Sequence, residues 1–158
     1  MKKMKRIAAL IAAGAAALML TACSGGGSKK AVDPAKTADE LNSNVITSDQ
    51  LTETAANMLS SIYFFEEGQV TASKAYMSNA STADEICVVT CKDEAAAKAA
   101  VELFKTRVKN QADLFASYNP DEATKLNDAI VESSGNAACL VVCDDYDKAK
   151  EILKKAGF

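Results

Sequence analysis

Residues 85–101, EICVVTCKDEAAAKAAV, and residues 137–153, AACLVVCDDYDKAKEIL, decide the fold, because each runs from a branched apolar segment into an alanine- and lysine-rich one. At a shift of 52 residues the two cysteines of one stretch align with the two of the other. Branched apolar residues favour strands, whereas alanine and lysine favour helices. Each stretch therefore predicts a buried strand followed by a helix, and the chain contains two similar units of this kind.

A second strand is predicted before each buried strand. Residues 69–78 alternate between apolar and polar side chains, and residues 79–84, NASTAD, read as a turn. In the second unit, residues 128–143 read as strand, turn and strand, with the turn at Ser134 to Asn136. Two β-β-α units predict an α+β fold, in which a four-stranded, mainly antiparallel sheet carries helices packed on one face.

Helices are also predicted from apolar spacing and from capping residues. Apolar residues recur every three or four positions in three segments, which are residues 48–62, residues 93–118 and the stretch from about residue 146 onward. Capping signals predict two further short helices, one beginning at Thr37 with Glu40 and one at Pro120. A third signal, Thr47 with Gln50, marks the start of the 48–62 helix. The sheet is therefore expected to be preceded by N-terminal helices.

Three consecutive aromatic residues, Tyr63, Phe64 and Phe65, stand before Gly68 at the end of the predicted 48–62 helix. One interpretation is an exposed aromatic patch that receives a partner. The other is that the rings close the end of the hydrophobic core, and large aromatic side chains most often serve in this way. The sequence favours the second interpretation.

Four cysteines, Cys87, Cys91, Cys139 and Cys143, stand in two C-x₃-C pairs whose spacing imitates a metal motif. In an extended strand the two cysteines of one pair lie ~13 Å apart, so they can neither share an ion nor form a disulfide with each other. Cross-strand disulfides, Cys87 with Cys143 and Cys91 with Cys139, remain possible in an exported protein. Buried reduced thiols are favoured, because cysteine packs as a small apolar residue.

The N-terminus predicts export and lipid attachment. MKKMKR is a basic start, IAALIAAGAAALM is an apolar run too short for an ordinary spanning helix, and LTAC at residues 20–23 resembles the lipobox of bacterial lipoproteins. This resemblance implies a signal peptide over residues 1–22 and a diacylglycerol thioether on Cys23. Residues 23–36 are expected to be the lipidated cysteine and a flexible Gly/Ser tether, and residues 37–158 a single domain.

Charge and composition exclude several functions. Removing residues 1–22 leaves 14 basic and 21 acidic residues, so the mature chain repels nucleic acid. The chain contains no histidine, which rules out Ser-His-Asp and Cys-His catalysis. The acidic run of Asp144, Asp145 and Asp147 offers calcium ligands, but capping of the last helix is the favoured interpretation. No catalytic residue, cofactor site or metal site is predicted.

The segment from Asp84-Glu85-Ile86, through a long helix carrying Arg107, to SYNP at residues 117–120 and Gly135 resembles domain-of-unknown-function family 4358. Members occur in small exported lipoproteins of Gram-positive anaerobes. The four cysteines depart from the aliphatic residues expected in that family. The resemblance implies lipid-anchored export and an α+β domain, and it brings no activity or ligand.

The expected function is that of a non-catalytic binding or interaction module on the extracytoplasmic face of the cell membrane. Its partners would be the membrane, through the lipid anchor, and an envelope protein, with no role for nucleic acid. Two alternatives stay open. One is an envelope thiol-dependent accessory enzyme that uses one of the four cysteines, and the other is a lipoprotein that binds a small solute.

Overall fold

The computed structural model describes residues 31–79 and 82–158, so the predicted signal peptide and Cys23 lie outside the described residues. In chain order the helices and strands are α1 (Pro34–Asn44), β1 (Thr52–Thr54), α2 (Ala56–Tyr63), β2 (Val70–Met77), β3 (Glu85–Cys91), α3 (Glu94–Phe115), α4 (Pro120–Asn127), β4 (Ile130–Ser134), β5 (Ala137–Val142) and α5 (Tyr146–Ala156). In these described residues, no helix is long and apolar enough to cross a membrane.

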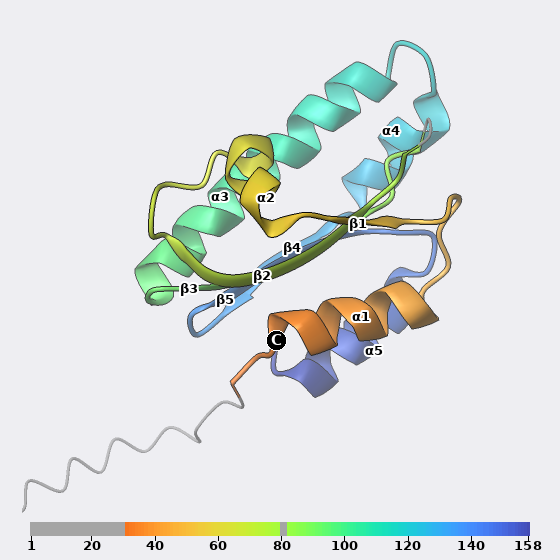
Figure 1. The fold of residues 1–158 in the computed structure, drawn as a ribbon. Helices are drawn as coiled ribbons and strands as arrows, with labels where there is room; N and C mark the ends of the chain where they lie inside the picture. Colours follow the sequence, from red (N-terminus) through yellow and green to blue (C-terminus); the bar gives the residue numbers. More distant parts are fainter. Residues whose placement is uncertain (1–30, 80–81) are drawn as a thin grey trace, which may run out of the picture.

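The strands form one antiparallel sheet in the order β1-β2-β3-β5-β4 (Figure 1). The predicted four-stranded sheet is therefore wrong, because β1 adds a fifth strand at one edge. From residue 31 onward, where the described chain begins, only α1 precedes this first strand, so the expectation of several helices before the sheet is also wrong. The two central strands, β3 and β5, are buried along nearly their whole length, as their largely apolar sequences require.

The edge strand β1 replaces the first part of the helix predicted over residues 48–62. Thr52, Glu53 and Thr54 pair with Met77, Tyr76 and Ala75 of β2. β-Branched threonine favours an extended backbone, and the ladder with β2 supplies hydrogen bonds that a short isolated helix would have to make alone. The remaining apolar positions of the segment form the shorter helix α2.

Helices cover both faces of the sheet, which corrects the prediction that they pack on one face only. In Figure 1, α2, α3 and α4 lie on one side of the strands, and α1 and α5 lie on the other. Strand β3 shows why both faces need a cover. Its residues Cys87 and Val89 belong to the core that contains Phe104 of α3, whereas Ile86 and Val88 belong to a second core beneath α1 and α5.

The predicted repeat of strand into helix is confirmed where each helix begins. α3 starts at Glu94 and α5 at Tyr146, 52 residues later, and each start is capped by the preceding aspartate. Asp93 accepts a hydrogen bond from the N–H of Ala96 at 2.7 Å, and Asp145 accepts one from Lys148 at 3.0 Å. The two helices nevertheless lie on opposite faces of the sheet (Figure 1).

The pairing register of β3 and β5 explains this difference. Cys87 lies opposite Leu140, and Val88 lies opposite Cys139, the counterpart of Cys87 in the repeat. Equivalent residues of the two units are thus separated by an odd number of positions across the ladder, as Val141, the counterpart of Val89, also shows by lying opposite Ile86. Since a shift of one residue moves a side chain to the other face of a sheet, the two units present opposite faces to their helices.

The other predicted helices fall close to their expected positions. α3 and α4 confirm the long helix after β3 and the short helix that starts at Pro120. α1 begins three residues before the predicted start at Thr37, with Pro34 in its first turn. Asp33 caps it by accepting a hydrogen bond from the N–H of Lys36 at 3.1 Å, so Asp33 takes the role assigned to Thr37.

A candidate binding groove between α2 and α3

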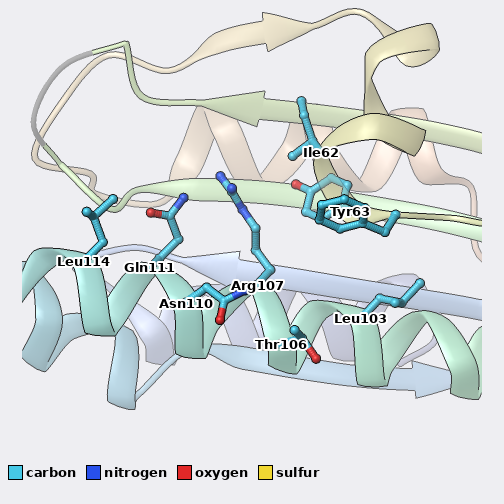
Figure 2. A pocket seen from close by; sticks show the side chains of 9 residues that line it. Ile62, Tyr63, Leu103, Thr106, Arg107, Asn110, Gln111 and Leu114 are labelled. Atoms are coloured by element: carbon cyan, nitrogen blue, oxygen red, sulfur yellow. The ribbon is translucent and has the colours of Figure 1, made fainter.

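A pocket of about 230 Å³ opens between the end of α2 and the middle of α3 (Figure 2). Its lining combines apolar side chains with amides and one guanidinium. The lining residues are Ile62, Tyr63, Phe64, Leu103, Thr106, Arg107, Asn110, Gln111 and Leu114. Two of them are large apolar side chains that are mostly exposed, Phe64 at 74% and Leu114 at 56%.

Phe64 ends α2 in the left-handed region, with φ 62° and ψ 35°, and is the non-glycine residue with positive φ in the described chain. Glycine or asparagine usually occupies such a position, because a Cβ atom is strained there. The neighbouring rings of Tyr63 and Phe65 are buried against Phe104, with centroids 5.1 and 5.7 Å from its ring. The prediction that the three aromatics close the core is therefore correct for two of them and wrong for Phe64.

Arg107, in the floor of the groove, belongs to a partly buried ion pair with Glu85. Arg107 donates from Nη2 to Glu85 Oε2 at 2.8 Å and from Nε to both carboxylate oxygens at 3.2 and 3.3 Å. Tyr63 Oη donates to Glu85 Oε1 at 2.6 Å. The Glu85 side chain is only 7% exposed, so this pair and the tyrosine hydroxyl satisfy a carboxylate that would otherwise be costly to bury.

Gln111 extends the polar floor along α3. With its amide assigned so that the oxygen rather than the nitrogen faces the guanidinium, the orientation that satisfies both groups, Gln111 accepts from Arg107 Nη1 at 2.8 Å and from Nη2 at 2.9 Å. Figure 2 shows Arg107 lying between Gln111 and Tyr63. Burial would lower the pKa of Arg107, but the Glu85 carboxylate outweighs burial and the pKa is raised. The guanidinium is thus permanently charged, and its charge is neutralised within the protein.

A second, shallower hollow of about 600 Å³ adjoins the first along α3. The two share Phe64 and Leu103. The second hollow is lined on α3 mainly by small residues and on its margin by charges. Its other lining residues are Glu66, Gln69, Lys92, Asp93, Ala95, Ala96, Ala99 and Glu102. We call the two hollows together the α3 groove.

The four cysteines of the strands are brought to two separate places. Cys87 and Cys91 lie in the core on the α3 side of the sheet, and Cys139 and Cys143 lie in the core on the α1 and α5 side. All four are buried free thiols. The cross-strand bridges Cys87–Cys143 and Cys91–Cys139 do not form, because the register places each cysteine opposite another residue and the members of each pair on opposite faces. The same separation prevents the four sulfurs from meeting at one ion.

Burial suppresses the reactivity of these thiols. It raises the pKa of Cys91 and of Cys143 to about 11, and it raises the pKa of Cys87 and Cys139 further. A reactive cysteine needs the reverse, an accessible sulfur with a lowered pKa. The thiol-dependent alternative therefore finds no favourable geometry at these positions.

A second charged cluster surrounds Lys125 of α4. Its Nζ lies 3.0 Å from Asp84 Oδ1, 3.2 Å from Glu122 Oε2 and 2.8 Å from Asp144 Oδ1, and it donates to Ser48 Oγ at 2.9 Å. Asp84 is fully buried and the Lys125 side chain is 10% exposed. We call these five residues the Lys125 cluster. It joins the 46–49 loop, the start of β3, α4 and the end of β5, so its position indicates a structural role.

The acidic run after β5 serves the purposes of capping and pairing. Asp145 is the N-cap of α5, and Asp147 lies in its first turn, which confirms the capping interpretation for both. Asp144 instead pairs with Lys125. In the described parts of the chain, no group of three or more Cys, His, Asp or Glu side chains has an arrangement that could hold a metal ion.

Sequence reasoning missed the groove for identifiable reasons. The pair of Glu85 and Arg107 joins a strand to a helix 22 residues away, and only the fold brings the two together. The exposure of Phe64 depends on its left-handed backbone conformation, which no glycine or asparagine in its place signals in the sequence. One signal was available, since Leu103 and Leu114 fall outside the apolar stripe that α3 presents to the sheet.

Residues 44–143 match the sequence profile of a protein family described as a domain of unknown function, DUF4358. The matched segment contains every strand and helices α2, α3 and α4, and so both sides of the α3 groove. No curated protein and no solved structure matches the chain.

Proposed function

The chain belongs to the DUF4358 family, and for this member we propose the role of a lipid-anchored, extracytoplasmic binding module that carries out no chemistry of its own. Its binding surface would be the α3 groove. One observation carries the proposal, namely that Phe64 and Leu114 expose large apolar side chains on either side of a pocket with a neutralised polar floor. Exposed apolar groups rimmed by polar ones are typical of interaction sites.

The backbone at Phe64 adds support. A left-handed conformation costs a residue with a Cβ about 1–2 kcal/mol, and the side chain held there is not used for packing in the core. Strain of this kind persists where a feature serves a purpose other than stability. An aromatic ring displayed beside a groove suits the recognition of a partner.

The lipid anchor is proposed from the sequence LTAC, with Cys23 as the residue that receives the diacylglycerol group. Two acyl chains hold a protein stably to a bilayer. The described chain begins at Ala31, which lies beside Lys155 and Ala156 of α5 on the face of the sheet opposite α2 and α3 (Figure 1). A tether entering on that face would leave the α3 groove open toward the surroundings.

Site-specific photo-cross-linking tests the binding role. A benzoylphenylalanine placed at position 114 in the full-length protein, in cells that process lipoproteins, should give a discrete adduct upon irradiation. The same group at position 46 is the matched control, because Ile46 is also highly exposed, at 64%, and lies outside the groove. Equal patterns from both positions, or no adduct from position 114, would contradict the proposal.

Intact-mass analysis tests the anchor separately. The protein purified from membranes should begin at Cys23 and carry the mass of a diacylglyceryl group, and Cys23→Ala should abolish both the cleavage and the added mass. A mature protein that begins elsewhere without lipid would remove the anchor from the proposal, while leaving the groove untouched.

A further inference from the structure

Helix α3 presents three distinct faces. One packs on the sheet through Ala97, Ala100 and Phe104. A second carries ion pairs between neighbouring turns, Glu94 with Lys98, Glu102 with Lys105 and Lys109 with Asp113. The third lines the α3 groove, and its residues recur at intervals of three or four. These residues are Ala95, Ala99, Leu103, Thr106, Asn110 and Leu114.

The third face forms a continuous strip along most of the helix. The α3 groove runs from Asp93 to Leu114, a distance of about 30 Å at 1.5 Å per residue. Its deeper part, about 230 Å³, is smaller than the roughly 300–1,000 Å³ of pockets that enclose a small ligand, and its wider part, about 600 Å³, is more open to the surface. A long, shallow strip with one deeper pocket suits a polypeptide that places a side chain in the pocket.

The spacing of the strip favours a helix as this polypeptide. Residues three and four apart on α3 form the ridges between which another helix inserts its own side chains. Ala95 and Ala99 at one end are small and exposed, so a second helix backbone can approach closely there. Leu103, Phe64 and Leu114 then supply apolar contacts in the central and distal parts, in the manner of grooves that receive amphipathic helices.

The charged residues of the groove determine which charge a partner should carry. At the end lined by alanine, Glu66 and Asp93 face one opposing lysine, Lys92, while Glu102 is paired with Lys105. In the middle, the charge of Arg107 is neutralised by Glu85. A complementary helix would therefore be basic beside its apolar stripe at the first end. A second copy of this chain suits the groove poorly, because the described residues contain 12 Lys and Arg against 21 Asp and Glu.

We propose that the α3 groove binds a basic amphipathic helix of a partner polypeptide, an inference that rests on the binding role proposed above. Phe64 and Leu114 contact the apolar stripe of that helix. Glu66 and Asp93 attract lysine or arginine residues beside it, and Ala95 and Ala99 allow the close approach of its backbone.

The test uses a labelled model helix of about 18 residues, made of leucine at helical spacing and lysine elsewhere. The protein is the chain from residue 24 onward, which contains every described element. Fluorescence anisotropy should show binding at least about tenfold tighter than that of a scrambled peptide of the same composition or of a leucine and glutamate version. Phe64→Gly and Leu114→Asn should each weaken it by about tenfold or more, and Ile46→Ala should leave it unchanged.

Several results would overturn the inference. Equal binding of the ordered and scrambled peptides would show that helical presentation is irrelevant. Equal affinities for the groove variants and for Ile46→Ala would place the contact elsewhere. A dimer in sedimentation experiments that Leu114→Asn dissociates would make a second copy the occupant. If the model helix fails while position 114 still gives a discrete cross-linked adduct, this inference falls and the binding role stands; if both fail, both fall.

Discussion

Phe64 is the residue at which stability and the proposed function oppose each other. Its backbone is left-handed and its ring is 74% exposed, so the folded protein accepts strain without gaining the burial of a phenyl ring. Tyr63 and Phe65 on either side are buried in the core. Glycine can replace Phe64 at this helix end, because glycine adopts the left-handed conformation without strain and the lost ring leaves few packing contacts behind.

Replacement of Phe64 should therefore separate strain from side-chain contact. Phe64→Gly relieves the left-handed strain and is expected to leave the free energy of unfolding unchanged or to raise it by up to about 1 kcal/mol. Phe64→Ala removes the same ring and keeps the strain, so it should be about 1 kcal/mol less stable than Phe64→Gly. Urea denaturation measures both, and equal stability of the two variants would contradict the account of the strain.

Replacement of Lys125 is expected to lower the stability of the protein strongly. Lys125→Met leaves the carboxylates of Asp84 and Glu122 buried without their cation, and removal of one partner from a buried ion pair costs about 3–5 kcal/mol. Lys148→Met is the matched control, because its pair with Glu151 is largely exposed, and there the expected cost is under about 1 kcal/mol. Similar unfolding midpoints for the two variants would show that the cluster is not structural.

Because of Asp144, the stability that the Lys125 cluster contributes should depend on pH. Burial alone would raise the pKa of Asp144, but hydrogen bonds from Lys125 and Ser48 outweigh it and lower the pKa. A lowered pKa in the folded state contributes stability above the unfolded value, about 3.9, and that stability is lost as the pH falls through the folded pKa. Asp144→Asn should thus be less stable than the wild type at pH 7, and the difference should shrink toward pH 3 in urea titrations. A constant difference would contradict this assignment.

At the scale of elements, the sequence predicted those helix starts that depend on residues close by in the chain. α3 and α5 begin directly after the capping residues Asp93 and Asp145, and α4 begins at Pro120, because aspartate and proline act within one turn of a helix. β1 escaped prediction because a strand of three residues exists only through its ladder with β2. The face occupied by α5 was not predicted, because it depends on the pairing register of β3 and β5, which no local pattern encodes.

The covered second face of the sheet makes α5 indispensable. α5 buries Ala149, Ile152 and Leu153 against the core that contains Ile86 and Val141. A chain that stops after Cys143 would expose this face, and we expect it to be insoluble or unfolded in circular dichroism. Exposed positions of α5 provide the control, since Lys154→Ala should leave the spectrum and the melting temperature unchanged. A folded, soluble truncated chain would show that α1 alone can cover this face.

At the scale of the whole molecule, different helices cover the two faces of the sheet, and the proposed function assigns the faces different roles. α1 and α5 cover one face, and the described chain begins beside them. α2, α3 and α4 cover the other face (Figure 1), and the α3 groove lies between α2 and α3 on that face. In the proposed arrangement, the first face is directed toward the lipid anchor and the second toward a partner. The buried thiols of the sheet belong to the scaffold that separates the two.

The most direct test of the proposed binding surface measures both cross-linking to a partner and stability toward unfolding in the same protein. Full-length protein with benzoylphenylalanine at position 114 is cross-linked in cells, with Phe64 either retained or replaced by glycine, and unfolding is measured on the same two proteins. We predict that Phe64→Gly abolishes the adduct while the unfolding midpoint stays the same or rises. An adduct that persists undiminished in the glycine variant would contradict the claim that the α3 groove is the binding surface.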